Sequence, residues 1–393
     1  MFDPELLYGV TNLPWWGLAL VTYGLIQLMF LGITLYLHRD QSHGGLELHP
    51  ILRHFFRFWL WLCSGTVTKE WVAVHRRHHA YADQPGDPHS PVVFGLKKVL
   101  LEGYELYVAG ARDKEILENY GRGTPDDWVE RNVYSRFPKT GIVLFSIIQL
   151  ILFGVPAILM VTIQLAAQPF FAAGVINGLG HHTGYRSFEM ASAATNIIPW
   201  GLFIAGEELH NNHHAFPWSA RFSLQRWEFD MGWLFIKIFS FFGLAKVKRV
   251  APRPRLEKKK KTLDTETVQA LFTNRMYVLR DYARRVVRPV CREIQRREPH
   301  GAIPPAAPKL LIRHPALLAE QAQRALRDLL ARHKELKTIH EFRERLTQLW
   351  NDANQARAVQ GLKEWCAQAE ASGIRALRDF AARLPAYSRA PAA

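Results

Sequence analysis

Two long apolar runs dominate the first half of the chain. Residues 13–37 form a stretch of 25 positions without a charged side chain. At about 1.5 Å per residue, a helix of this length exceeds a bilayer core of about 30 Å. A second uncharged run covers residues 141–180, with Gln164, Gln168 and Pro169 near its middle. These three residues predict the turn of a helical hairpin, so the pattern as a whole predicts about three membrane crossings.

Two shorter apolar stretches, residues 51–67 and 190–206, lie beside segments that are rich in histidine. The first contains Arg53 and is amphipathic, and the second contains Asn196. If either stretch crossed the bilayer, the histidines on its two sides would face opposite compartments and could not build one site. Both stretches are therefore predicted to form interfacial helices.

A cleaved signal peptide is the alternative interpretation of the first apolar run. It is disfavoured because the run is long, Asp3 and Glu5 precede it, and no small-residue cleavage site follows. Lys and Arg side chains between the apolar runs and after the second run favour a cytoplasmic position for those segments. We therefore expect a multi-pass protein of the cell inner membrane, with its histidines and its C-terminus in the cytoplasm.

Composition divides the chain into two unlike parts. Hydrophobic residues make up 48% of the 393 positions, yet the mean hydropathy is only −0.10. Residues 1–250 contain 21 Lys and Arg against 20 Asp and Glu, whereas residues 251–393 contain 29 against 15. We therefore predict a membrane domain at 1–250, a basic linker at 251–261 and a basic helical extension at 262–393.

The extension has helical periodicity over residues 263–297, 315–335, 338–370 and 374–384, with a break at 301–308. Its positive charge is compatible with a solvated appendage, with contact to anionic lipids, or with nucleic-acid binding. Nucleic acid is the least favoured partner, because the extension follows a membrane domain and has no recognisable binding motif.

Thirteen of the 17 histidines fall between positions 38 and 214. Most belong to four clusters with the sequences HRDQSH, HRRHH, NGLGHH and HNNHH, which begin at His38, His75, Asn177 and His210. In HxxHH on a helix, side chains three or four residues apart share a face and can reach one point. His38 and His43 are five residues apart, so they can converge if their helix loosens.

The number of histidines indicates a metal site with more than one ion. Imidazole binds zinc, copper, iron and nickel, so the ligand type alone does not identify the metal. One tetrahedral zinc cannot use so many ligands, whereas two irons can. His182 cannot easily bind the same metal as its neighbour His181. Cys63, Cys291 and Cys366 are far apart in sequence, which excludes a disulfide framework and any Cys-based zinc or iron–sulfur site.

The order of these clusters resembles the membrane-bound acyl desaturases of the stearoyl-CoA desaturase type, here as a bacterial form with a basic C-terminal extension. GDPHSP at residues 86–91 and WEFD at residues 227–230 add to the resemblance, which covers about residues 13–250. It implies an all-α membrane fold with a cytoplasmic histidine-rich cap that binds two iron ions (Fe²⁺/Fe³⁺). The implied ligands are His38, His43, His75, His78, His79, His181, His210, His213 and His214, with Asn177 acting through a water. The animal enzymes have two spans before the first cluster, whereas this chain has room for one.

The resemblance implies an oxidoreductase that uses O₂ to desaturate a saturated fatty acyl chain, at the delta-9 position, for membrane lipids. The acyl chain would arrive as a CoA thioester or within a phospholipid. A diiron hydroxylase, or another oxidation that includes alkene formation, is the alternative, because histidine-ligated iron supports each outcome. A metal-transport protein is disfavoured, because residues 17–37 contain no ionisable group other than Tyr23 and Tyr36.

Supporting groups and an electron donor complete the predicted site, and no catalytic side chain beyond the metal ligands is expected. Five residues near the clusters are expected to orient the ligands or brace the site: Asp40, Asp87, His89, Glu207 and Glu208. The chain has no cysteine cluster and no GxGxxG motif after a strand, so a separate ferredoxin- or flavin-type protein must supply electrons. We expect that protein to dock on the basic cytoplasmic face.

Overall fold

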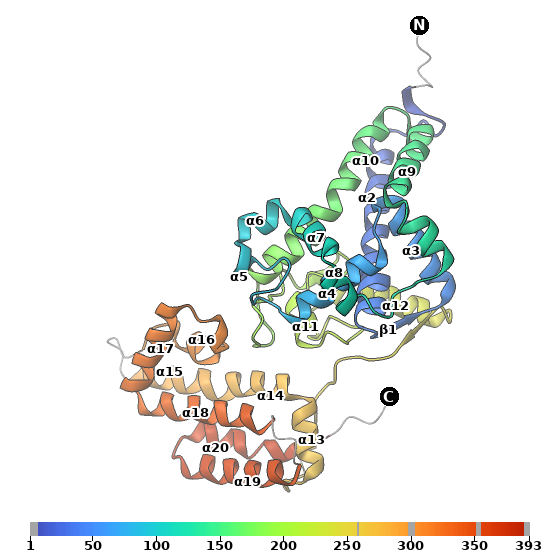
Figure 1. Ribbon diagram of the computed structural model, residues 1–393. Coiled ribbons are helices and arrows are strands. Elements are labelled where there is room, and N and C mark those ends of the chain that lie inside the picture. The colour runs from blue at the N-terminus through green and yellow to red at the C-terminus, as the bar shows by residue number, and fades with distance from the viewer. Residues whose placement is uncertain (1–6, 258, 298–302, 351–354, 389–393) are drawn as a thin grey trace. The chain divides into compact units, whose positions relative to one another are not determined.

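The computed structural model describes residues 7–257, 259–297, 303–350 and 355–388 (Figure 1). The chain divides into two compact units: the first is Met1–Arg186 with Ser192–Ala251, and the second is Ser187–Ala191 with Pro252–Ala393. Both units are mainly helical, and the strands in the described ranges form three two-stranded pairs.

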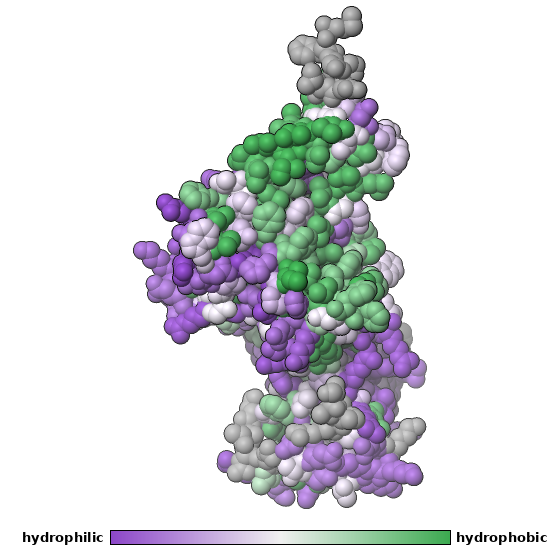
Figure 2. Space-filling model, turned by 90° about the vertical axis from the view of Figure 1, so that its right-hand side faces the viewer, coloured by the Kyte–Doolittle hydropathy of each residue, from purple (hydrophilic) through white to green (hydrophobic). Residues whose placement is uncertain are grey.

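Long apolar helices form a column in the first unit (Figure 1). They are α2 (Trp15–Gly32), which continues into the π-helix η1 (Ile33–Ser42), α9 (Pro138–Phe153), and α10 (Pro156–Ala167), which continues into the π-helix η3 (Gln168–Ile176). α10 packs against both α2 and α9, and Figure 2 shows the apolar surface of this column. Two continuous helices, Trp15–Ser42 and Pro156–His181, are long and apolar enough to cross a membrane, and α9 is a shorter apolar helix.

The hairpin turn lies at Gly154, so the prediction of a turn at Gln164, Gln168 and Pro169 is wrong. Gly154 has a φ of +65° and connects α9 to α10. Gln164 is buried within α10 and exchanges two hydrogen bonds with Gln149 of α9, at 2.7 and 3.1 Å. Two amides that satisfy each other can lie inside an apolar hairpin, so Gln164 marks a helix–helix contact.

A cap of short helices and loops completes the first unit. Its helices are α3 (Pro50–Ser64), α4 (Thr68–Ala80), α5 (Pro91–Phe94), α6 (Leu96–Leu101), α7 (Gly103–Arg112), α8 (Lys114–Tyr120), η2 (Glu130–Tyr134), η4 (Leu179–His181), α11 (His210–Ala215) and α12 (Met231–Phe241). β1 (Leu46–Leu48) pairs antiparallel with β4 (Ala245–Val247), and β2 (Trp200–Gly201) pairs parallel with β3 (Phe229–Asp230). α3 is amphipathic: it buries Phe56 and Leu60 and exposes Ile51, Phe55 and Phe58.

Residues 190–206 do not form the helix that was predicted for them. This stretch is irregular apart from β2 and an isolated bridge between Tyr185 and Asn196. The buried side chain of Asn196 donates to the Asn212 side chain at 3.1 Å and accepts from the Asn212 amide at 3.1 Å. The polar side chain therefore ties the segment to α11, which explains why an uncharged sequence follows a loop path.

The second unit is a helical bundle around an apolar core. Its helices are α13 (Thr265–Thr273), α14 (Arg275–Tyr282), η5 (Ala283–Val287), α15 (Arg288–Arg297), α16 (Ala307–Ile312), η6 (Pro315–Leu317), α17 (Glu320–Arg332), α18 (Lys334–Leu349), α19 (Gln355–Ala371), α20 (Arg375–Ala381) and η7 (Leu384–Ala386). The buried Trp365 ring contacts Tyr282, Phe342 and Phe380 in the core.

Two predictions about the extension need correction. β5 (Arg255–Leu256) pairs antiparallel with β6 (Tyr387–Ser388), so part of the predicted linker belongs to the fold of the second unit. The predicted helix 338–370 is two helices, α18 and α19. Part of the predicted break at 301–308 lies outside the described residues.

Candidate metal centre

A π-helix brings the first two histidines together. His38 lies within η1, and His43 follows its last residue. The His43 amide donates to the His38 carbonyl at 3.2 Å, an i→i+5 bond that widens the helical turn. Two residues five apart then face the same side, as the spacing of this cluster required.

The two HxxHH motifs lie on α4 and α11, and each motif divides its rings between two groups. On α4, His75 and His79 are four residues apart and face one group, whereas His78 faces the other. On α11, His213 faces the first group, whereas His210 and His214 face the second. Each short helix therefore contributes to both groups at once.

All nine histidines that were predicted as ligands belong to these two groups, and within each group one ring nitrogen of every histidine lies within 4.8 Å of those of the others. The first group is His38, His43, His75, His79 and His213, and the second is His78, His181, His210 and His214. Opposing Nε2 atoms are close: His38 and His213 are separated by 2.9 Å, as are His181 and His210. The structure places His182 outside both groups, exposed and bonded to Thr183.

This set of donors fits two transition-metal ions. Burial lowers the pKa of His79, His213 and His214 well below the usual value, so these rings are neutral at physiological pH. Neutral imidazoles keep the lone pair that a metal requires. Five and four nitrogens, gathered at two points, exceed the four ligands of a single tetrahedral zinc.

Three carboxylates accept hydrogen bonds from rings of the two histidine groups. Glu207 accepts a hydrogen bond from His38 Nδ1 at 2.8 Å, and Asp87 accepts one from His78 Nδ1 at 2.9 Å. Asp83 accepts one from His181 Nδ1 at 2.9 Å. A bond at Nδ1 fixes the ring and leaves Nε2 free to bind a metal. Two of these carboxylates, Glu207 and Asp87, were predicted as supporting residues.

Asp83 is one of the carboxylates that lie near the histidine clusters in sequence, although it is not in the predicted set of five supporting residues. Its carboxylate also accepts hydrogen bonds from the Ser90 hydroxyl at 2.7 Å and the Ala193 amide at 2.6 Å. Burial alone would raise its pKa, but the bonds from His181 and Ser90 hold the pKa of Asp83 well below the usual value. The sequence shows only an aspartate near the second cluster, because His181 lies 98 residues away.

The other predicted supporting residues do not orient a ligand. Asp40 accepts hydrogen bonds from Arg53 at 2.7 and 2.8 Å. Glu208 accepts backbone amide bonds from residues 203, 204 and 206, and burial raises its pKa. The His89 ring lies 4.7 Å from the His78 ring, centroid to centroid, without a hydrogen bond to it. The contacts of Asp40 and Glu208 therefore differ from the expected role, whereas His89 lines the cavity beside the histidine groups.

The WEFD stretch braces two segments that carry predicted ligands. Asp230 binds Arg39, the neighbour of His38, at 2.9 and 3.1 Å, and both partners are buried. Glu228 accepts a hydrogen bond from Asn212 on α11 at 2.7 Å. The motif alone did not predict these contacts.

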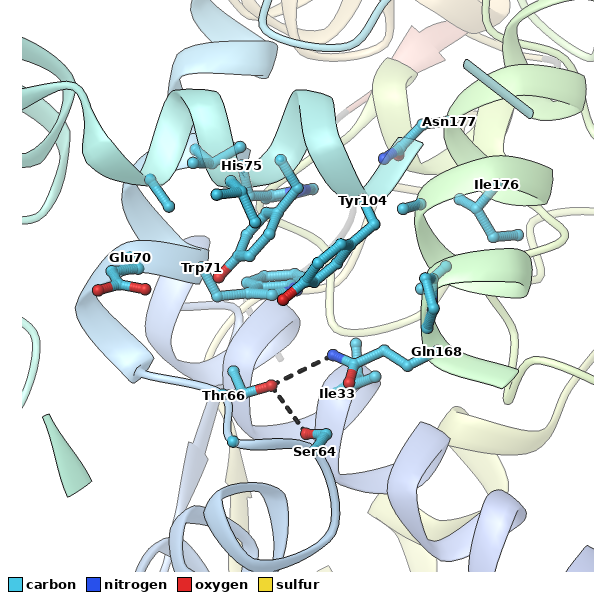
Figure 3. A pocket seen from close by; sticks show the side chains of 18 of the residues that line it. Ile33, Ser64, Thr66, Glu70, Trp71, His75, Tyr104, Gln168, Ile176 and Asn177 are labelled. Carbon is cyan, nitrogen blue, oxygen red and sulfur yellow. Dashed lines mark hydrogen bonds between the residues drawn. The ribbon is translucent and has the colours of Figure 1, made fainter. Parts of the chain in front are cut away.

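A cavity of about 760 Å³ reaches the histidine groups. His38, His75, His210 and Asn177 line it, together with a largely apolar wall. Figure 3 shows Trp71 and Tyr104 between the region of His75 and a polar group at Thr66, where Gln168 donates to the Thr66 hydroxyl at 3.2 Å. This volume suits a small molecule or one long apolar chain.

Comparison with known proteins identifies relatives of the first unit. The family model described as fatty acid desaturase matches residues 13–233. The delta-9 acyl-lipid desaturase 2 of Arabidopsis thaliana is 31% identical over 61% of this chain and 78% of its own length. The sn-1 stearoyl-lipid 9-desaturase of Synechocystis is 32% identical over 58% of this chain and 70% of its own length. An acyl-CoA 5-desaturase of Anemone leveillei is 31% identical over 54% of this chain and 66% of its own length.

The second unit is similar to a different family. A family model described as transposase matches residues 277–390, which begin within α14 and include the helices from η5 to η7. The expected basic extension is therefore similar to part of a family that its charge and helical periodicity did not indicate. The expectation that nucleic acid is the least favoured partner stays a prediction.

Proposed function

This chain belongs to the fatty acid desaturase family and is an oxidoreductase, and we propose that it uses O₂ and a histidine-ligated diiron centre to desaturate a fatty acyl chain at the delta-9 position. The nine histidines named above would hold the two irons, with Asn177 acting through a water. The observation that carries this proposal is the pair of converging imidazole groups, members of which line a largely apolar cavity.

Desaturation needs an oxidant stronger than any side chain, and two bound irons supply the activation of O₂ that removes hydrogen from a methylene. The protein's own residues do the positioning. Glu207, Asp83 and Asp87 fix the rings of His38, His181 and His78. The apolar wall excludes bulk water and holds the acyl chain so that one pair of carbons lies at the histidine end.

The substrate is a fatty acyl chain on CoA or in a phospholipid. Relatives whose names include acyl-lipid and acyl-CoA desaturases support both carriers. A separate ferredoxin- or flavin-type protein supplies the electrons. The apolar column spans the cell inner membrane three times, with α9 as the third crossing, and the histidine cap faces the cytoplasm.

Lipid analysis tests the reaction. Cells that express the chain should contain unsaturated acyl chains that control cells lack, with the double bond mapped to the ninth carbon. Hydroxylated acyl chains in place of unsaturated ones would support the hydroxylase alternative and overturn desaturation.

Metal analysis of the purified protein tests the cofactor. About two irons per chain are expected, and His213→Ala should lose iron and activity. The exposed His182→Ala is the matched control and should keep both. One zinc per chain without iron would overturn the diiron assignment.

A further inference from the structure

A row of arginines lies on one helix of the second unit. α14, η5 and α15 follow one another without a break and form one continuous helix from Arg275 to Arg297 (Figure 1). Four arginines recur at every fourth position of this helix, and all four are exposed: Arg284, Arg288, Arg292 and Arg296. At about 1.5 Å per residue, neighbours in this arginine row are about 6 Å apart along the helix axis, and the row is about 18 Å long.

The packing of the helix keeps the arginine row on the outside. Val286, Val290 and Ile294 each follow an arginine of the row by two residues, which is about 200° around a helix. All three are at most 5% exposed and belong to the apolar core of the second unit. The π-turn η5 offsets part of the rotation that a four-residue repeat accumulates on an α-helix. The arginines therefore point away from the core and share one outer face.

The charge of the arginine row is not compensated within the described residues. Residues 275–297 contain eight arginines and two acids, and both acids contact other arginines. Asp281 accepts a hydrogen bond from Arg285 at 2.7 Å, and Glu293 pairs with Arg297. None of the four row arginines has an ion pair or a hydrogen bond to a described residue. Like charges four residues apart destabilise a helix, so contact with a polyanion would relieve their repulsion.

The polyanionic surface within reach of this unit is a membrane. α12 ends beside Phe241 and Phe242, which are 84% and 67% exposed, and exposed aromatic rings of this kind favour the membrane–water interface. The second unit resumes at Pro252, ten positions after Phe242, and ten residues span at most about 35 Å. A tether of this length gives the second unit a high effective concentration at the lipid surface.

We propose that the arginine row binds anionic lipid headgroups of the membrane that holds the first unit. A guanidinium donates two parallel hydrogen bonds to phosphate oxygens, and four of them along one line can contact several headgroups at once. Each arginine near an anionic surface strengthens binding roughly fivefold. Duplex DNA is the competing polyanion, because residues 277–390 are similar to a family described as transposase, and the test includes it.

The test holds the full chain in nanodiscs of phosphatidylcholine and measures its binding to added protein-free vesicles by flotation. The vesicles contain phosphatidylcholine alone or equal parts of phosphatidylcholine and phosphatidylglycerol, and duplex DNA of mixed sequence is offered separately. One variant carries Arg284→Gln, Arg288→Gln, Arg292→Gln and Arg296→Gln. The matched control removes four positive charges from other exposed positions of the same unit: Arg324→Gln, Arg327→Gln, Arg332→Gln and Lys337→Gln.

Wild-type protein and the control variant should bind the phosphatidylglycerol vesicles, and added salt should release them. The variant of the arginine row should bind at least about tenfold more weakly, and wild-type protein should bind vesicles of phosphatidylcholine alone just as weakly. Equal losses in the two variants would show that only net charge matters and would overturn the inference. Tighter binding to DNA than to the anionic vesicles would assign the row to nucleic acid and would also overturn it.

A second measurement uses wild-type protein and does not depend on how a variant folds. Phenylglyoxal modifies accessible arginines, and mass spectrometry gives the extent of reaction at each position. The row arginines should react more slowly in nanodiscs that contain phosphatidylglycerol than in nanodiscs of phosphatidylcholine, whereas the exposed Arg324 should react equally in both. Equal reaction of the row in both lipids would overturn the inference. Neither result depends on the proposed desaturation, so a failure of that proposal would be seen separately.

Discussion

The two units bury different kinds of side chain. The first unit buries many titratable groups, among them Arg39, Asp83, Asp87, Glu207 and Asp230 as well as the histidines. Among the described residues of the second unit, Arg343 is the only buried charged side chain. The core of the second unit is instead apolar and centres on Trp365, Tyr282 and Phe380.

This contrast shows which unit is built around chemistry. A buried charge costs free energy unless a partner compensates it, and in the first unit Glu207, Asp83 and Asp87 are each compensated by a ring of the two histidine groups. The core of the second unit is mainly apolar, and its buried Tyr282 and Trp365 donate to backbone carbonyls. The residues that the structure describes in the second unit contain no group of metal-ligating side chains. Changes to the two units should therefore have separable effects on iron and on stability.

Removal of one ligand should have the largest effect. His78→Ala removes a ring of the second histidine group and leaves Asp87 without its bond to that ring. We expect loss of iron and of all desaturation, measured by metal analysis and by the fatty acid composition of expressing cells. Protein that retains two irons per chain would show that His78 is not a ligand.

A substitution that leaves a large cavity in the core of the second unit should have the next largest effect, on the stability of that unit. Trp365→Ala removes a fully buried ring and should destabilise that unit by about 3–5 kcal/mol. Limited proteolysis should show faster cleavage within residues 252–388, whereas iron content should stay at the wild-type value. A parallel loss of iron would show that the two units are not separable in this way.

Loss of one bracing carboxylate should weaken the metal site without abolishing it. Asp83→Asn keeps the shape of the side chain but removes the charge that His181 contacts. Groups of this kind typically change metal affinity by roughly 10–100-fold, which iron titration of the iron-free protein would measure. Asp126→Asn changes an exposed carboxylate and should leave the affinity unchanged.

Removal of the second unit should have the smallest effect on iron. A chain that ends at Ala251 retains all nine grouped histidines and the WEFD stretch. We expect it to insert into membranes, to bind iron and to turn over saturating substrate. Truncated protein that inserts but binds no iron would contradict the separation of the two units.

Local sequence patterns predicted much of the candidate site, because most of its geometry is helical. HxxHH fixes the directions of three rings on α4 and on α11 within five residues, and the nine predicted ligands do meet in space. The carboxylates were harder to predict. Asp83 and Asp40 have similar sequence contexts near a histidine cluster, yet Asp83 meets His181 and Asp40 meets Arg53. That choice depends on chain segments that are distant in sequence.

In the fold, too, features set by neighbouring residues were predictable, whereas features set by contacts between distant segments were not. The long apolar helices were visible as uncharged runs, but the position of the hairpin turn was not, because a glutamine can mark either a turn or a buried helix contact. Gln164 is satisfied only by Gln149, 15 residues earlier. Residues 190–206 followed a loop path for a similar reason, since the side chain of Asn196 finds its partner on α11.

Because residues Ile33–Ser42 form a π-helix, the orientation of the preceding helix relative to His43 depends on the exact number of residues in this segment. A turn of this kind contains one residue more than an α-helical turn, so deletion of a single residue would restore ordinary winding. Everything on the N-terminal side would then rotate by about 100° relative to His43. Apolar faces that now meet α10 would turn away, although every remaining side chain would be unchanged. Evolution can therefore replace residues here far more readily than it can gain or lose one.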